Sequence, residues 1–105
     1  MTNKSKARGT AWETRAGRYL GLRRLPLAGN KDLGDLDCDI AVVECKNTKV
    51  FDLAGWMDEL DVEMRNAEKG YGFVIFPRRN YKVGKSYCLM PLDQLNEILE
   101  LIRRA

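Results

Sequence analysis

The 105-residue sequence contains no histidine. Without an imidazole the chain cannot form a Ser-His-Asp triad, a histidine acid–base pair or the common histidine-containing zinc sites, so these active sites are largely excluded. Cysteine is scarce as well: Cys38, Cys45 and Cys88 are an odd number and have no paired spacing. A disulfide framework is therefore not expected, and a reducing compartment is favoured.

Long apolar runs are also missing, because no stretch approaches the roughly 20 residues that a membrane-spanning helix needs. The basic segment MTNKSKARGT is followed by no apolar region, so it predicts neither a secretory signal nor a transit peptide. The composition, with 45% hydrophobic and 31% charged residues, is that of an ordinary soluble protein. We expect one domain over residues 1–105, located in the cytoplasm, with residues 1–8 as a basic, flexible tail.

Charge is present but unevenly distributed along the chain. Residues 1–24 are rich in lysine and arginine and contain Glu13 as their only acid, and residues 78–85 carry bases and no acid. The segment between them, residues 32–68, is dominated by aspartate and glutamate. Such a division suits a protein that holds a polyanion against an acidic, metal-binding pocket, although a solvated charged surface explains it equally well.

Hydrophobic periodicity predicts an α/β fold with elements in the order α, β, β, β, α, β, β, α. The predicted helices cover residues 9–22, about 53–70 and 91–104, and the predicted strands lie at 24–29, at 71–79, at 86–90 and in a tight hairpin over 34–46 with a very short first arm. Thr10 fits the N-cap of the first helix, and Glu13 then completes a capping box.

The stretch GDLDCDIAVVECKN, residues 34–47, carries the most specific signal. A period of two along the strand puts Ile40, Val42, Glu44 and Lys46 on one face, and the hairpin brings Asp35 towards them. Two carboxylates beside one ammonium would hold a hard cation such as Mg²⁺ and place a positive charge next to a phosphate or an attacking water. Taken alone, a Glu-x-Lys pair is more often a weak ion pair on a sheet edge.

In chain order, the helical Glu13, the pair Gly34-Asp35 and the strand VVECKN resemble the PD-(D/E)XK nuclease superfamily. The resemblance covers roughly residues 5–78 and is greatest to Holliday junction resolvases of the archaeal and phage type, although Gly34 stands where the family motif has proline. It implies a restriction-endonuclease-like αβββαβ core with a mixed central sheet flanked by helices. The present chain would add a C-terminal strand and helix to that core.

The resemblance also implies roles for individual residues. Asp35 and Glu44 would bind Mg²⁺, for which Mn²⁺ should substitute, and the backbone carbonyl of Cys45 would supply a further oxygen. Lys46 would orient or activate the attacking water. Glu13 would help to hold the metal or its water, in competition with the capping role, and Asp37 is the alternative aspartate ligand. The implied reaction is hydrolysis of a DNA phosphodiester that leaves a 5′-phosphate and a 3′-hydroxyl.

Several basic residues outside this stretch are candidates for salt-sensitive contacts with DNA phosphates, namely Lys4, Lys6, Arg8, Arg78, Arg79, Lys82 and Lys85. No base-reading motif is visible, which favours recognition of DNA shape, such as a four-way junction. Cutting such a junction on two symmetry-related strands calls for a homodimer, with Trp56, Met57 or the last helix as candidate contacts.

Three other interpretations stay open at this stage. The chain could be a nuclease of the same fold that acts on flaps, nicks or ends. It could bind DNA without cleaving it, in which case Asp35, Glu44 and Lys46 have no need to act together. It could also be an adaptor that keeps the fold and has lost the activity.

Overall fold

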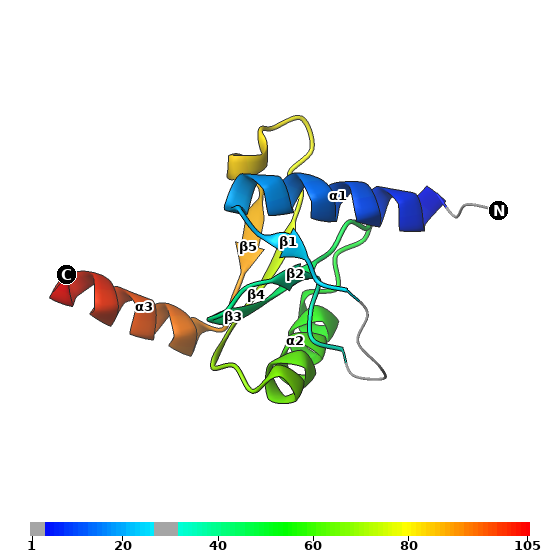
Figure 1. Cartoon of the computed structure of the whole chain (residues 1–105). Coiled ribbons are helices and arrows are strands. Elements are labelled where there is room, and N and C mark those ends of the chain that lie inside the picture. Colours follow the sequence, from blue (N-terminus) through cyan, green and yellow to red (C-terminus); the bar gives the residue numbers. More distant parts are fainter. Residues whose placement is uncertain (1–3, 27–31) are drawn as a thin grey trace.

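The computed structural model describes residues 4–26 and 32–105, without the side chains of residues 4–7. Within those residues the chain forms an α/β fold with three α-helices and one five-stranded mixed sheet (Figure 1). The elements follow the predicted order, with one short 3₁₀ helix added: α1 (Lys4–Leu20), β1 (Arg23–Arg24), β2 (Leu36–Asp37), β3 (Ala41–Cys45), α2 (Leu53–Ala67), β4 (Tyr71–Phe76), η1 (Val83–Lys85), β5 (Tyr87–Leu89) and α3 (Leu92–Arg104).

The strands lie in the sheet in sequence order, β1-β2-β3-β4-β5. The predicted hairpin is confirmed, because β2 and β3 pair antiparallel with Leu36 opposite Val43. β4 runs parallel to β3, since α2 carries the chain back across the sheet between them, and β5 returns antiparallel to β4. β3 is therefore the central strand, with two strands on either side of it, and it ends at Cys45.

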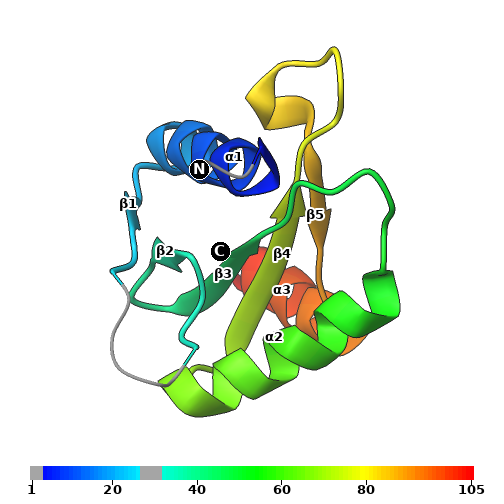
Figure 2. The same cartoon turned by 90° about the vertical axis from the view of Figure 1, so that its right-hand side faces the viewer.

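The two faces of the sheet are covered by different helices (Figure 2). Val42 packs with Trp56 and Leu60 of α2, while Val43, the next residue, packs with Trp12 and Ala16 of α1. The alternation predicted for β3 is thus confirmed, and it directs Glu44 to the same side as Val42. The indole Nε1 of Trp12 also donates to the Ile75 carbonyl at 3.2 Å, which ties α1 to the sheet.

The first helix differs from its prediction at both ends. It begins at Lys4, so residues 4–8, expected to form a tail, are its first turns, and it ends at Leu20. Gly9 costs a helix only about 1 kcal/mol relative to alanine, and the flanking Ala7, Arg8 and Ala11 are good helix formers. The Thr10 N-cap and its capping box are therefore wrong. Thr10 lies inside the helix, where its carbonyl accepts a hydrogen bond from the Thr14 hydroxyl at 3.0 Å.

The second helix is bounded by polar groups at both ends. Asp52 caps its start by accepting a hydrogen bond from the Gly55 amide at 3.0 Å. The helix stops at Ala67, three residues before the expected end at Gly70, because Glu68 adopts the left-handed conformation with φ 55°. Within the two described ranges, no helix unites the length and the apolar character that a membrane span requires.

The last helix, α3, is attached at its first turn and then leaves the rest of the molecule (Figure 1). Its anchor is the buried Gln94, whose side-chain amide exchanges two hydrogen bonds with the backbone of Gly72, at 2.8 and 2.9 Å. Beyond this anchor the apolar stripe of the helix is solvent-exposed, as shown by the exposed fractions of Leu99 (39%) and Ile102 (63%).

Candidate functional site

Asp35 is fixed between two strands at the start of the β2–β3 hairpin. Its backbone amide donates to the Val43 carbonyl at 2.9 Å, and its side-chain Oδ2 accepts a hydrogen bond from the Cys45 amide at 2.7 Å. Gly34 makes this approach possible, because it has φ 100° and a Cβ atom there would lie 2.9 Å from Val42 Cγ1. The unusual backbone at Gly34 thus turns the Asp35 carboxylate towards the end of β3.

Glu44 and Lys46 lie at that end of β3 and share a face, as predicted. The side chain of Glu44 is buried, and its Oε1 lies 3.8 Å from the Lys46 Nζ. The carboxyl groups of Glu44 and Asp35 are close enough to share a hydrogen bond when one of them is protonated. Lys46 also bonds Glu59 of α2, at 2.6 Å between Nζ and Oε2. The three predicted residues therefore form one contiguous group.

Glu63 of α2 is a further member of this group that the sequence prediction missed. Its side chain is 1% exposed, and one of its carboxylate oxygens lies within 4.8 Å of oxygens of Glu44 and Asp32. A signal for it exists in the sequence: Glu63 follows Trp56 by two helical turns and Leu60 by one, so it occupies the apolar stripe of the helix.

Glu13 reaches the same group from α1. Its Oε2 accepts a hydrogen bond from the Arg24 Nε at 2.9 Å, and its carboxyl group is within hydrogen-bonding reach of Asp35. Since the capping role is excluded by the position of Thr10, the contacts of Glu13 are with Arg24 and the acidic group. Arg24, which was not among the predicted site residues, is the base on this side of the group.

Crowding of the carboxylates disfavours their charged forms. Burial, followed by the charge of Glu44, raises the pKa of Asp35 to about 7, and burial with the neighbouring Glu63 raises the pKa of Glu44 to about 9. Burial also raises the pKa of Glu63 and that of Glu13, the latter together with the charge of Asp35. Without a bound cation, the group therefore holds protons at neutral pH.

Lys46 and Cys45 each have one protonation state at neutral pH. Burial disfavours the ammonium of Lys46, but the hydrogen bond to Glu59 and the charges of Glu44 and Glu59 outweigh burial and raise the pKa of Lys46. Burial raises the pKa of the Cys45 thiol far above its usual range, with Asp35 and Glu13 adding to the shift. Lys46 is therefore a positively charged hydrogen-bond donor and not a general base. The Cys45 side chain stays a neutral thiol and is not a thiolate ligand for a metal.

Comparisons with models of protein families, with curated proteins and with solved structures find no match. The chemical capacity of the site has to be judged from its own atoms. All of its acidic side chains offer oxygen, and in the described part of the chain Glu44 Oε2 and both oxygens of Glu63 have no hydrogen-bond donor when the acids are ionised. Oxygen donors of this kind fit a hard divalent cation such as Mg²⁺.

Asp37, the alternative aspartate, is not part of this group. It follows the buried Leu36 in β2, is itself exposed and pairs in register with Arg23 of β1. Asp35, two residues earlier, makes the contacts with Cys45 and Glu44 instead. The predicted ligand from Cys45 is its backbone carbonyl. Cys45 is the last residue of β3 and stands between Glu44 and Lys46 in the chain, so its backbone lies at the same end of the strand as their side chains.

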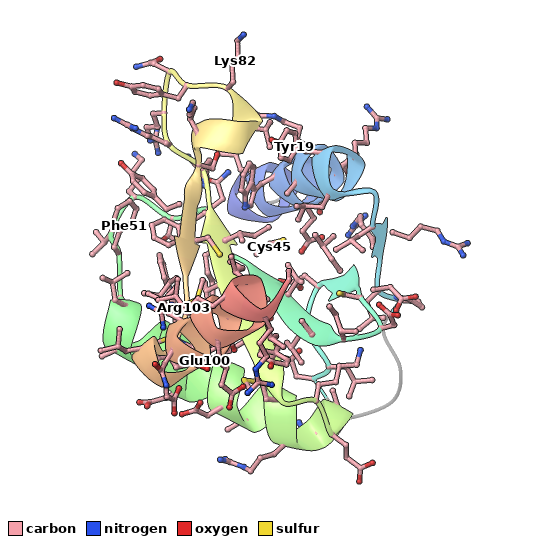
Figure 3. All side chains as sticks on the ribbon, turned by 90° about the vertical axis from the view of Figure 1, so that its left-hand side faces the viewer. Tyr19, Cys45, Phe51, Lys82, Glu100 and Arg103 are labelled. Carbon is pink, nitrogen blue, oxygen red and sulfur yellow. The ribbon has the colours of Figure 1, made fainter. Side chains whose placement is uncertain are left out.

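The predicted phosphate-binding residues are only partly close to the site. The side chains of Lys4 and Lys6 lie outside the described residues, and Arg8 is exposed on α1. Arg78 lies over the ring of Tyr81, with its Cζ atom 3.7 Å from the ring centroid, while Lys82 points away from the body at the tip of the β4–β5 loop (Figure 3). Lys85 ends η1 and is exposed.

An open groove of about 310 Å³ starts at Asn47, the residue after Lys46, and runs to the β4–β5 loop. Its polar lining comes from the residues that follow β3 and from Arg78 and Arg79, and its aromatic lining includes Phe51 and Tyr81. Bases alternate here with exposed aromatic rings, as in surfaces that bind nucleic acids. Lys49, which was not among the predicted phosphate contacts, is a third base of this groove.

Proposed function

We propose that the chain is a Mg²⁺-dependent endodeoxyribonuclease that cleaves branched DNA, with a four-way junction as its substrate. The observation that carries this proposal is the group formed by Asp35, Glu44 and Lys46 at the end of a central strand. The buried carboxylate of Glu44 and the half-buried carboxylate of Asp35 offer a cation site, and the protonated Lys46 places a positive charge 3.8 Å from Glu44. The order of helices and strands agrees with the αβββαβ core of the PD-(D/E)XK nucleases, to which the sequence motifs are similar.

Asp35 and Glu44 would hold the Mg²⁺, together with the backbone carbonyl of Cys45. The ion, when bound, would supply positive charge that activates a water and stabilises the negative charge on the phosphoryl oxygens of the transition state. The Lys46 ammonium donates a hydrogen bond to the water or to a non-bridging phosphate oxygen. A bond to the water orients it for attack, and a bond to the phosphate oxygen stabilises its negative charge. Glu59 holds the Lys46 amine in place, and Glu13 orients the group from the side of α1.

The DNA backbone would approach through the groove beside Lys46. Arg78, Arg79 and Lys49 line it and would contact phosphates, which makes binding independent of sequence and sensitive to salt. The exposed ring of Phe51 offers a stacking surface for a base whose stacking is interrupted at a branch point, which does not happen within a continuous duplex. This feature favours branched DNA over linear DNA as the substrate.

We further propose that the protein acts as a homodimer through α3. Of the candidate contacts named from the sequence, Trp56 is buried and Met57 packs against the core, whereas the stripe of Leu95 and Leu99 on α3 is exposed. The helix begins with acidic and ends with basic residues, so two antiparallel copies place opposite charges side by side. Such a self-complementary contact is what a two-fold axis requires.

The cleavage test compares four-way, Y-shaped and linear DNA in Mg²⁺, Ca²⁺ and EDTA. We expect cleavage of the four-way junction in Mg²⁺ alone, and its loss in Glu44→Gln, which keeps the shape of the side chain but removes its charge. The matched control is Asp58→Asn, which removes an exposed acid from α2. Cleavage by Glu44→Gln at the wild-type rate would refute the site, and preference for Y-shaped or linear DNA would refute the junction substrate.

Binding without cleavage under every condition would favour a non-catalytic DNA-binding protein. The dimer is tested separately by analytical ultracentrifugation of Leu99→Glu, which should be monomeric. Glu97→Lys changes the charge on the polar side of α3, away from Leu95 and Leu99, and should stay dimeric. A wild-type protein that sediments as a monomer at high concentration would refute the dimer.

A further inference from the structure

The acidic group contains more carboxylates than one Mg²⁺ needs. Mg²⁺ in enzymes is usually bound by one or two carboxylates, with water and substrate oxygens completing its shell. Asp35 and Glu44 already provide that number. Glu63 and Asp32 are further neighbours of Glu44, and one oxygen from each of Asp32, Glu44 and Glu63 lies within 4.8 Å of the other two.

Glu63 is the most deeply buried acid of the group, so its charged form loses the most contact with water. Its side chain is 1% exposed, and among the described residues neither of its oxygens has a hydrogen-bond donor, while the inner oxygen of Glu44, Oε2, has none either. The base nearest in the strand, Lys46, is already engaged by Glu59 at 2.6 Å. A carboxylate that is buried in this way normally requires a cation or a proton.

Asp32 completes the arrangement from the loop before β2. The loop is attached to the same helix as Glu63, since the Asn66 side chain donates to the Asp32 carbonyl at 3.1 Å. The carboxylate of Asp32 is exposed, so the cluster has a buried side at Glu63 and a solvent-facing side at Asp32 through which a hydrated ion could enter. Its three acids are the oxygen donors that Mg²⁺, Mn²⁺ and Ca²⁺ prefer.

We propose that Asp32, Glu44 and Glu63 form a second divalent-cation site, which shares Glu44 with the site of Asp35. Carboxylates bridge the two ions in many two-metal centres, where the ions lie about 3.5–4 Å apart. The sharing of Glu44 rests on the proposed function, because the first ion is the one assigned there to Asp35 and Glu44. The second site itself depends only on the position of Glu63 and its neighbours.

The test counts bound Mn²⁺ ions on the full chain after removal of metals with EDTA, by equilibrium dialysis and electron paramagnetic resonance at about pH 8. We expect two Mn²⁺ per wild-type chain, one for Glu63→Gln and one for Asp35→Asn. Asp58→Asn, which removes an exposed acid from the same helix as Glu63, should keep both. Two Mn²⁺ on Glu63→Gln, or only one on the wild type, would overturn the second site.

These outcomes separate the second site from the proposed function. Loss of one Mn²⁺ in Glu63→Gln by a protein that cleaves no DNA would support the cation site and refute the nuclease. Junction cleavage by a wild-type chain that binds one Mn²⁺ would support the nuclease and refute the second cation site. The absence of any bound Mn²⁺ from the wild type would refute both.

A thermal melt in EDTA guards against a variant that simply fails to fold. Because the buried carboxyl group of Glu63 lies among other acids and has no hydrogen-bond donor within the described residues, Glu63→Gln should melt at or above the wild-type temperature in EDTA and should gain less from added Mn²⁺. A lower melting temperature in EDTA would show that Glu63 stabilises the metal-free fold, and it would overturn the inference. Glu63→Leu, which suits the apolar stripe of α2, should behave like Glu63→Gln.

Discussion

The metal-free protein should lose stability as the pH rises from about 5 to about 8. In the folded chain the pKa of Asp35 is raised to about 7 and that of Glu44 to about 9, from ordinary values of 3.8 and 4.5. Between the ordinary and the raised values, the folded protein binds protons that the unfolded chain has released. The free energy of unfolding therefore decreases with pH, and this contribution to stability is lost as the pH passes through the raised values.

The size of the effect follows from the number of extra protons. One proton held in excess by the folded state corresponds to about 1.4 kcal/mol per pH unit. We count one shared proton for the whole group, because its members are coupled and Asp35 is partly exposed to solvent. The three pH units from 5 to 8 then cost about 4 kcal/mol, which for a domain of this size lowers the melting temperature by on the order of 20 °C.

The assay is thermal denaturation, followed by circular dichroism, across this pH range in EDTA and again in Mg²⁺. The lack of histidine helps, since no imidazole titrates in the same range. In EDTA, the double variant Asp35→Asn/Glu44→Gln should show a melting temperature that depends less on pH, and Asp58→Asn should behave like the wild type. Added Mg²⁺ should raise the wild-type melting temperature and reduce its dependence on pH. A wild-type melting temperature in EDTA that is constant or rises from pH 5 to 8 would refute the reasoning.

Three further predictions concern single residues. Gly34→Ala should destabilise the fold by about 1–3 kcal/mol, because φ is positive there and the new Cβ meets Val42; an unchanged urea midpoint would contradict this. Gln94→Leu leaves the amide and carbonyl of Gly72 without partners, so it should cost about 2–3 kcal/mol and speed hydrogen exchange at the start of α3, where wild-type exchange rates would argue against the anchor. Lys46→Met should slow single-turnover cleavage by about 10²–10³ while DNA binding persists, and a wild-type rate would remove Lys46 from the reaction.

The centre of the site was predictable because its residues are close in sequence. The alternation along β3 follows from the strand period, so the spacing of Glu44 and Lys46 is enough to place them on one face. Asp35 lies only one hairpin away from Glu44. Local geometry of this kind requires no knowledge of how helices pack.

The remaining members depend on packing between distant segments. Glu63 belongs to the site because α2 docks its apolar stripe on β3, and an acid in such a stripe is easily assigned to the solvent face of a helix with many acids. For Glu13 a capping role beside the N-cap candidate Thr10 competed with the role in the metal site, but favourable neighbours extend the helix through Gly9 and remove the cap. The stripe of α3, with Leu95 and Leu99, has no partner within the described chain, so no intrachain contact could have been inferred for it correctly.

The assembly of the acidic group has a consequence for how the chain folds. The β2–β3 hairpin brings Asp35 to Glu44 through local contacts, whereas Glu63 arrives only when α2 packs on the sheet. Local hairpins form within microseconds, and packing of a crossover helix is the longer-range step. Repulsion among the acids therefore arises at two separate folding steps, the formation of the β2–β3 hairpin and the docking of α2. The docking of α2 is the step at which binding of a proton or a cation can alter the folding rate.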